Sequence, residues 1–207
     1  MRPLGQLLEG ASRPVFFRGV ATVCMKLFNV CAPERVYFGQ KDIQQTVVIR
    51  RLVRDFHLDT DVRISPTARE PDGLALSSRN VYLGSRRRNV GIVLNQALRK
   101  AEAQYKAGKR SRGDILWPAN DHADKILLQQ DDMDPSKRAL FEVDYISLAD
   151  PETMEEVDEV DESRGAILSG AIKMLPIERP SIGEELGVGG GLIPVRLIDN
   201  IVLDSVS

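Results

Sequence analysis

Cysteine and histidine are both scarce, with two of each in 207 residues. Cys24 and Cys31 lie in an apolar segment that predicts a helix, and at about 1.5 Å of rise per residue they are roughly 10 Å apart, too far for a disulfide. We expect both to be buried free thiols. Because His57 and His122 are remote from them in the sequence, no zinc ligand set is available and no metal site made of protein side chains is predicted.

Long apolar runs are missing as well. No stretch approaches the roughly 18 uninterrupted apolar residues that a membrane span needs, and the start Met1-Arg2-Pro3-Leu4 lacks the apolar region of a signal peptide. We therefore expect a soluble, cytoplasmic protein with no membrane partner. The chain is 43% hydrophobic and 28% charged, which suits one large or two small domains with a buried core.

Aromatic residues make up only 5% of the chain, and their scarcity helps to decide which ligand the basic residues bind. The net charge of −2 hides an asymmetry: residues 1–112 hold 21 Lys and Arg against 9 Asp and Glu, and residues 113–207 hold 7 against 21. Such a basic half can bind nucleic acid, bind a small anionic substrate, or attract the acidic half. Few aromatics and scattered arginines make nucleic acid the weakest of these, and a polyphosphate substrate is favoured.

Two segments carry the polar groups expected of a phosphate site. In Phe38–Gln45 a strand ends at Gly39 and passes into a helix with Lys41 and Asp42 at its start, where N–H groups and cations together hold an anion. Taken singly, Gly39 also suits an ordinary turn and Asp42 a helix cap. Asp72–Asn80 opens with Asp-Gly and offers two hydroxyls and a guanidinium for phosphate oxygens, although these residues also suit a capped surface loop.

One glutamine of this helix is expected to face inward. Gln45 lies four and seven residues before Ile49 and Leu52, so helical periodicity places it on the apolar stripe, where its amide needs a partner. Gln44 is expected at the periphery.

The first part of the chain predicts an α/β fold. Helix, strand, helix and strand are expected at 15–29, 35–38, 42–56 and 61–64, the order typical of a parallel sheet. Only two strands precede the loop 68–83, so this part resembles half of a doubly wound domain.

The remainder predicts a smaller α+β domain. We expect a helix capped by Ser85 and reaching Lys106, a helical region broken at Trp117-Pro118, and an antiparallel sheet of strands 140–148, 166–174 and 193–202. The predicted division is therefore 1–83 and 84–207. The acidic stretch 150–162 is read as a solvated loop, and the glycine run 187–191 as a loop without the Lys-Ser/Thr of a P-loop.

These segments resemble the pantothenate synthetase (pantoate–β-alanine ligase) family. The similarity is nearly continuous from Ser12 to Leu83, through Phe17-Arg18-Gly19-Val20-Ala21-Thr22-Val23, Tyr37–Gln45 and Pro66–Asn80, and Arg196–Ile201 is a weaker match. The resemblance implies a partial Rossmann-like (HUP-type) nucleotide-binding sheet followed by a smaller lid domain.

The resemblance also implies a reaction and a site. ATP with Mg²⁺ on its phosphates would activate pantoate as an adenylate, and β-alanine would then displace AMP. The implied ATP site is formed by Gly39, Gln40, Lys41, Asp42, Ala68, Leu76, Ser77, Ser78 and Arg79. Of these, Lys41, Ser77, Ser78 and Arg79 would be catalytic, the last three as the family's version of the KMSKS loop. Gln45 would hold pantoate, and the helix 15–30 would form a homodimer.

The chain also departs from the family pattern. Leu76 stands where a methionine is frequent, and nothing in residues 1–11 resembles the family's segment with the two-histidine HIGH-like motif and a second pantoate-binding glutamine. We therefore expect an incomplete nucleotide fold with uncovered apolar surface and poor solubility. Two alternatives stay open: a non-catalytic nucleotide-binding or dimerisation partner, and an adenylate-forming transferase that uses another acid.

Overall fold

The computed structural model describes residues 5, 7–13 and 15–205. The start Met1–Leu4 lies outside them. The α-helices are α1 (Glu9–Ser12), α2 (Phe16–Cys31), α3 (Ile43–Asp55), α4 (Gly84–Gly91), α5 (Val93–Lys106) and α6 (Arg112–Asp131). The strands are β1 (Arg35–Gly39), β2 (Asp61–Ser65), β3 (Phe141–Ala149), β4 (Ala166–Met174) and β5 (Val195–Leu203), and two 3₁₀ helices are η2 (Gln40–Asp42) and η3 (Ser78–Tyr82).

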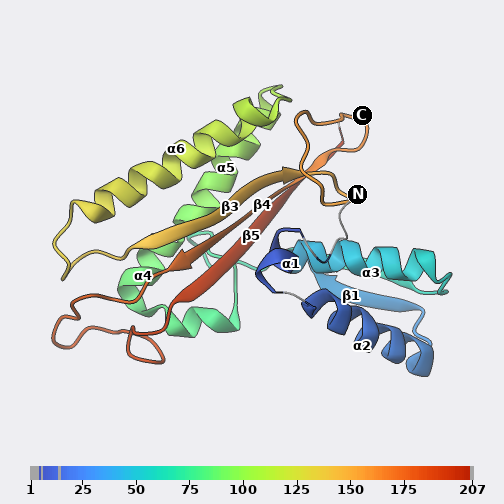
Figure 1. Cartoon of the computed structure of the whole chain (residues 1–207), viewed down its shortest axis with the longest axis horizontal. Coiled ribbons are helices and arrows are strands. Elements are labelled where there is room, and N and C mark those ends of the chain that lie inside the picture. Colours follow the sequence, from blue (N-terminus) through green and yellow to red (C-terminus); the bar gives the residue numbers. More distant parts are fainter. Residues whose placement is uncertain (1–4, 6, 14, 206–207) are drawn as a thin grey trace.

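The first part forms the predicted parallel pair. β1 and β2 run parallel with Phe38 opposite Ile64, and α3 connects them, since parallel neighbours need a crossover. β1 ends at Gly39 and continues through η2 into α3, which confirms the expected passage from strand to helix. α2 and α3 lie beside this pair (Figure 1).

The second part contains the predicted three-stranded antiparallel sheet, and its strands lie in the order β3-β4-β5. α5 and α6 cover one of its faces, and α1, α2, α3 and β1 lie on the other side (Figure 1). The main core fills the helix-covered face, where Leu148, Leu168 and Leu197 pack with Leu98 and Ile115. Gly170 allows this close packing, because a Cβ there would lie 2.8 Å from a methyl group of Leu94. β5 is the edge strand nearest the parallel pair.

Three helix predictions were wrong. The expected helix 85–106 is two helices, separated at Ile92, and Ser85 does not cap the first; its N–H instead donates to the carbonyl of Glu185. The break expected at Trp117-Pro118 does not occur, because α6 runs through Pro118. Pro118 lacks a backbone N–H, so the carbonyl of Asp114, four residues earlier, loses its helical donor. Because Asp114 is solvent-exposed, the loss of this one hydrogen bond does not break the helix.

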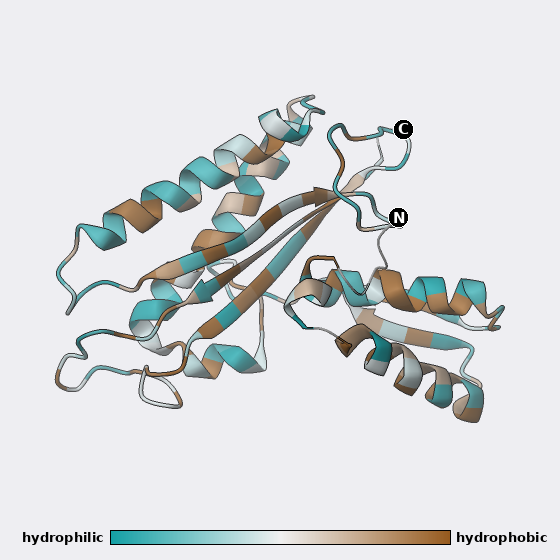
Figure 2. Cartoon of the chain, in the orientation of Figure 1, coloured by the Kyte–Doolittle hydropathy of each residue, from teal (hydrophilic) through white to brown (hydrophobic). Residues whose placement is uncertain are grey.

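α2 is covered on one side only. Phe17 and Phe28 are buried, whereas Val23, Leu27 and Val30 are 57%, 53% and 84% exposed. Brown apolar segments accordingly recur along the outer surface of α2 (Figure 2). The same exposure corrects the expectation of buried thiols: Cys24 is half-buried and Cys31 exposed, and both are free.

Within residues 5, 7–13 and 15–205, no helix combines the length and apolar character needed to cross a membrane. The same residues contain no cluster of three or more His, Cys, Asp or Glu able to hold a metal ion.

Candidate functional site

A cavity of about 200 Å³ lies where η2, the loop before η3 and the antiparallel sheet meet. It brings together six of the predicted site residues from two distant segments: Lys41, Asp42, Gln45, Ser77, Ser78 and Arg79. The two segments therefore face the same space.

Lys41 supplies a partly desolvated cation to this cavity. Burial lowers the pKa of its ammonium; the Asp42 charge raises it, Arg79 lowers it, and Asp199 raises it. No salt bridge to Lys41 forms among the residues that the structure describes. Asp42 occupies the N-cap position of α3, but its side chain accepts no capping hydrogen bond, so the capping interpretation is wrong. Asp42 is instead one of the residues that line the cavity.

Ser77, Ser78 and Arg79 form the opposite wall. Ser77 caps η3, and its Oγ accepts a hydrogen bond from the Arg79 N–H at 3.2 Å. The cap interpretation of this loop is thus correct for Ser77, and the same three residues also line the cavity. The Arg79 guanidinium makes no ion pair with any described residue and is solvent-exposed, so it retains its donors for an anion.

Four other predicted ATP-site residues lie outside the lining of this cavity: Gly39, Gln40, Ala68 and Leu76. Open space surrounds Gly39, since a Cβ there would meet no atom within 4 Å. The Gln40 side chain donates to Asn200 Oδ1 at 3.1 Å. Ala68 and Leu76 are exposed and joined by a backbone hydrogen bond of 2.9 Å, which closes the loop between them.

The two glutamines of α3 exchange the positions expected of them. Gln44 is buried, 2% exposed, and is not peripheral: its Oε1 accepts from the Glu9 N–H at 3.0 Å and its Nε2 donates to the Leu7 carbonyl at 2.9 Å. Gln45 is half-buried in the cavity wall, and its amide has no hydrogen-bond partner among the described residues. The amide is therefore available to a ligand.

The segment around α1 contributes side chains that sequence reasoning did not select. Glu9 and Arg13 line the cavity, and Arg196 holds the Glu9 carboxylate through two hydrogen bonds of 2.6 and 2.8 Å. Tyr145 donates to the same carboxylate at 2.8 Å, and burial followed by the Glu9 charge raises the pKa of its hydroxyl. Tyr145 therefore stays protonated as a donor. No local pattern pairs residues 136 positions apart, which is why these were missed.

The antiparallel sheet presents a polar row toward the cavity. Ser147, Ser169 and Asn200 are cross-strand neighbours on β3, β4 and β5, so their side chains share one face. All three are buried, and the Oγ atoms of Ser147 and Ser169 have no hydrogen-bond partner among the described residues. Ser169 and Asn200 line the cavity. Ser169, which stands within the apolar run 166–172 of β4, was the available signal.

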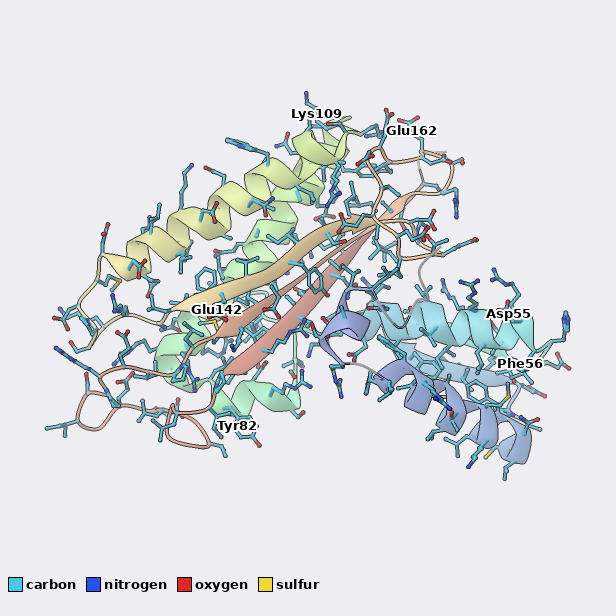
Figure 3. The ribbon with its side chains drawn as sticks, viewed as in Figure 1. Asp55, Phe56, Tyr82, Lys109, Glu142 and Glu162 are labelled. Atoms are coloured by element: carbon cyan, nitrogen blue, oxygen red, sulfur yellow. The ribbon has the colours of Figure 1, made fainter. Side chains whose placement is uncertain are left out.

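Of the two loops that were not assigned to the site, the glycine run 187–191 lies outside the lining of this cavity, whereas Met154 of the acidic loop is part of the lining. The acidic loop is partly neutralised within the chain, through Arg110–Glu162, Arg112–Glu156 and Arg164–Asp150 ion pairs, rather than simply solvated. Glu162 lies beside the turn that carries Lys109 (Figure 3). The glycine run joins a turn to β5, and four of its glycines have positive φ.

Comparisons with known proteins identify the family of this chain. The family model described as pantoate-beta-alanine ligase matches residues 1–202. The pantothenate synthetase of Chloroflexus aurantiacus is 46% identical over 199 residues, which cover 96% of this chain and 60% of the relative. That of Chloroflexus aggregans is 48% identical over 168 residues, covering 81% of this chain and 56% of the relative.

Solved structures give the same result. The enzyme from Thermus thermophilus superposes with a TM-score of 0.74 at 34% identity, covering 97% of this chain and 61% of that one. The Francisella tularensis ligase, crystallised with a β,γ-ATP compound and β-alanine, gives a TM-score of 0.52 at 25% identity, covering 98% of this chain and 57% of that one. The chain thus spans about 60% of the length of these relatives. By sequence and by fold, it belongs to the pantoate–β-alanine ligase (pantothenate synthetase) family.

Proposed function

We propose that this chain provides the phosphate-facing part of a pantoate–β-alanine ligase. The full reaction condenses pantoate with β-alanine through a pantoyl adenylate and releases AMP and pyrophosphate. The observation that carries the proposal is the convergence of Lys41, Gln45 and the Ser77–Arg79 loop on one cavity. We further propose the domain division 1–83 and 84–207, with the second part as the lid.

Each group has a task that follows from its chemistry. Lys41 and Arg79 hold the ATP phosphates and neutralise the charge that grows as pyrophosphate leaves. The Ser77 and Ser78 hydroxyls donate to phosphate oxygens. Gln45 binds pantoate and orients its carboxylate toward the α-phosphate, so that the reacting atoms meet without a further search. Gly39 gives the nucleotide access to the backbone.

Asp42 is the acidic residue of the cavity that fits a Mg²⁺ ion arriving on the nucleotide. Glu9 and Asp199 are already in ion pairs with arginines, and Asp42 has no salt bridge among the described residues. Mg²⁺ is commonly held by one or two carboxylates together with substrate phosphates and water, so Asp42 and the phosphates would hold it. When bound, the ion neutralises phosphate charge.

Pyrophosphate release tests the whole assignment. We expect the chain to bind ATP in equilibrium titrations and, once joined to the amino-terminal residues of the Chloroflexus aurantiacus enzyme, to release pyrophosphate only when pantoate is present. Release with other hydroxy acids but not pantoate would indicate a transferase with another substrate. ATP binding without release by the joined protein would indicate a non-catalytic partner. Full activity of the 207 residues alone would contradict the expectation of an incomplete site.

Gly39→Ala separates nucleotide access from folding. Gly39 has φ −77° and ψ 133°, which alanine adopts freely, and its Cβ would meet nothing in the chain, so we expect unchanged or slightly higher stability. We expect ATP affinity to fall about tenfold, since the methyl group occupies the space of the ligand. Titration calorimetry and thermal unfolding measure the two effects. Gly113→Ala, which is equally unhindered in α6, should leave affinity unchanged; equal affinities for all three chains would refute the role of Gly39.

The proposed homodimer uses the exposed apolar side of α2. Val23, Leu27 and Val30 recur at helical spacing on this uncovered surface. We expect Leu27→Lys to shift the chain toward monomer in sedimentation velocity, because it places a charge in the apolar contact. Leu128→Lys, on a residue of α6 that is 64% exposed, should leave the distribution unchanged. A monomeric unaltered chain at all concentrations would argue against this partner.

A further inference from the structure

β5 is connected to the Gln40–Lys41 turn by the buried side-chain amide of Asn200. Asn200 is 1% exposed, and its Nδ2 donates to the backbone carbonyls of Gln40 at 2.9 Å and Lys41 at 3.0 Å. Its Oδ1 accepts from the Gln40 side chain at 3.1 Å. One side chain thus fixes the backbone of both residues that lead into α3, including the residue that bears the cavity's ammonium.

Its neighbour reaches the second segment. Asp199 is 4% exposed and binds the Arg69 guanidinium through two hydrogen bonds of 2.6 and 2.8 Å. Arg69 also donates to the Gly73 carbonyl at 3.0 Å, inside the loop that leads to Ser77. Asn95 of α5 donates to Asp199 at 3.1 Å, so the carboxylate is anchored to the main core as well.

Strand geometry explains how two adjacent residues serve two segments. Successive side chains of a strand point to opposite faces, so Asn200 faces the turn while Asp199 faces the α5 side and Arg69. The backbone N–H of Asn200 donates to Asp199 Oδ1 at 2.8 Å, which fixes the Asp199 carboxylate against the backbone of its neighbour. β5 is the edge strand closest to the parallel pair, and this position makes both contacts possible (Figure 1).

We propose that Asp199 and Asn200 are positioning residues that set the distance between the Gln40–Lys41 turn and the Arg69–Ser77 loop. The link to ATP rests on the function proposed above. Neither residue needs to touch the nucleotide. Lys41 and Arg79 lie on separate segments that are far apart in sequence, and a shared support on β5 keeps their charges at a fixed separation for one phosphate chain. The lid sheet thereby becomes part of the phosphate site.

Three variants of the full chain test this. Asn200→Ser removes the amide that binds both carbonyls, and Asp199→Asn removes the charge that holds Arg69 with little change in shape. Glu178→Gln is the matched control, because Glu178 also makes a two-bond ion pair, with Arg138, away from the cavity. Hydrogen exchange by mass spectrometry, ATP titration and thermal unfolding are measured on each.

We expect Asn200→Ser to speed exchange at residues 40–43, and Asp199→Asn at residues 69–77, by about tenfold or more, each with a rise of about tenfold in the ATP dissociation constant. Glu178→Gln should change neither. Unchanged exchange in both segments, or an increase spread evenly over the chain, would overturn the proposal. If the unaltered chain binds no ATP, the proposed function fails, and the local exchange pattern still decides whether these residues position the two segments.

Discussion

Lys41→Met is expected to weaken ATP binding about 10- to 100-fold, the loss expected when a charge-assisted hydrogen bond to phosphate is removed. The fold should not suffer. Burial lowers the pKa of Lys41, so between this lowered pKa and 10.5 the unfolded chain binds more protons than the folded one. Stability contributed by this group therefore rises with pH through that window, and at neutral pH the buried charge opposes folding.

The measurement combines ATP titration with urea unfolding at several pH values. Lys41→Met should be at least as stable as the unaltered chain at about pH 7. Between the lowered pKa of Lys41 and 10.5, its free energy of unfolding should rise less with pH than that of the unaltered chain. Lys137→Met, on an exposed lysine, should alter neither affinity nor this slope. Undiminished ATP affinity in Lys41→Met would remove the main support for the phosphate site.

Arg87→Met is expected to cause the largest loss of stability: it should lower the free energy of unfolding by about 3 kcal/mol or more. Arg87 is fully buried and forms no ion pair with a described residue; its guanidinium donates to the carbonyls of Leu83, Ile193 and Tyr82. Burial lowers its pKa, yet guanidinium remains charged at any ordinary pH. Methionine fills much of the volume of the arginine side chain, but the buried carbonyls that accepted hydrogen bonds from the guanidinium are left without a donor.

Urea unfolding followed by circular dichroism measures this effect. Arg88→Met provides the control next to it in sequence, because its pair with Asp72 is partly exposed and should contribute about 1 kcal/mol or less. Similar losses for the two variants would show that the Arg87 carbonyl contacts add little. ATP affinity measured below the unfolding transition should be retained in Arg87→Met, since this residue lies outside the cavity lining.

Local pattern was sufficient for most of the fold. Residues 166–174 form the predicted strand without any shift, and the order of helices and strands in the first part follows the periodicity of apolar residues. Predictions failed where the outcome depended on contacts between distant segments. α6 continues through Pro118 because its carbonyl partner is exposed to water, and Cys31 is exposed because no described residue covers that side of α2.

The site residues likewise divide into those that local sequence indicates and those that depend on contacts between distant segments. Lys41 and Ser77–Arg79 were selected because each segment carries its chemistry within a few residues, and both segments line the cavity. Gln44 was misplaced because the carbonyl and N–H that satisfy it come from residues 35 to 37 positions away. Asn200 was overlooked for the same reason, since its partners lie 159 and 160 positions earlier. Hydrogen-bond partners at this range follow from tertiary packing and leave no local periodicity.

The ion pairs that join the basic and acidic halves differ in their contact with solvent, and added salt should therefore act on them unevenly. Arg112–Glu156 is more than one third exposed on both sides and will be screened as the Debye length shortens. Arg69–Asp199, with a carboxylate only 4% exposed, will be shielded from mobile ions. Raising ionic strength should thus loosen the acidic loop before it disturbs the β5 support, even though the same ions compete with ATP for Lys41 and Arg79.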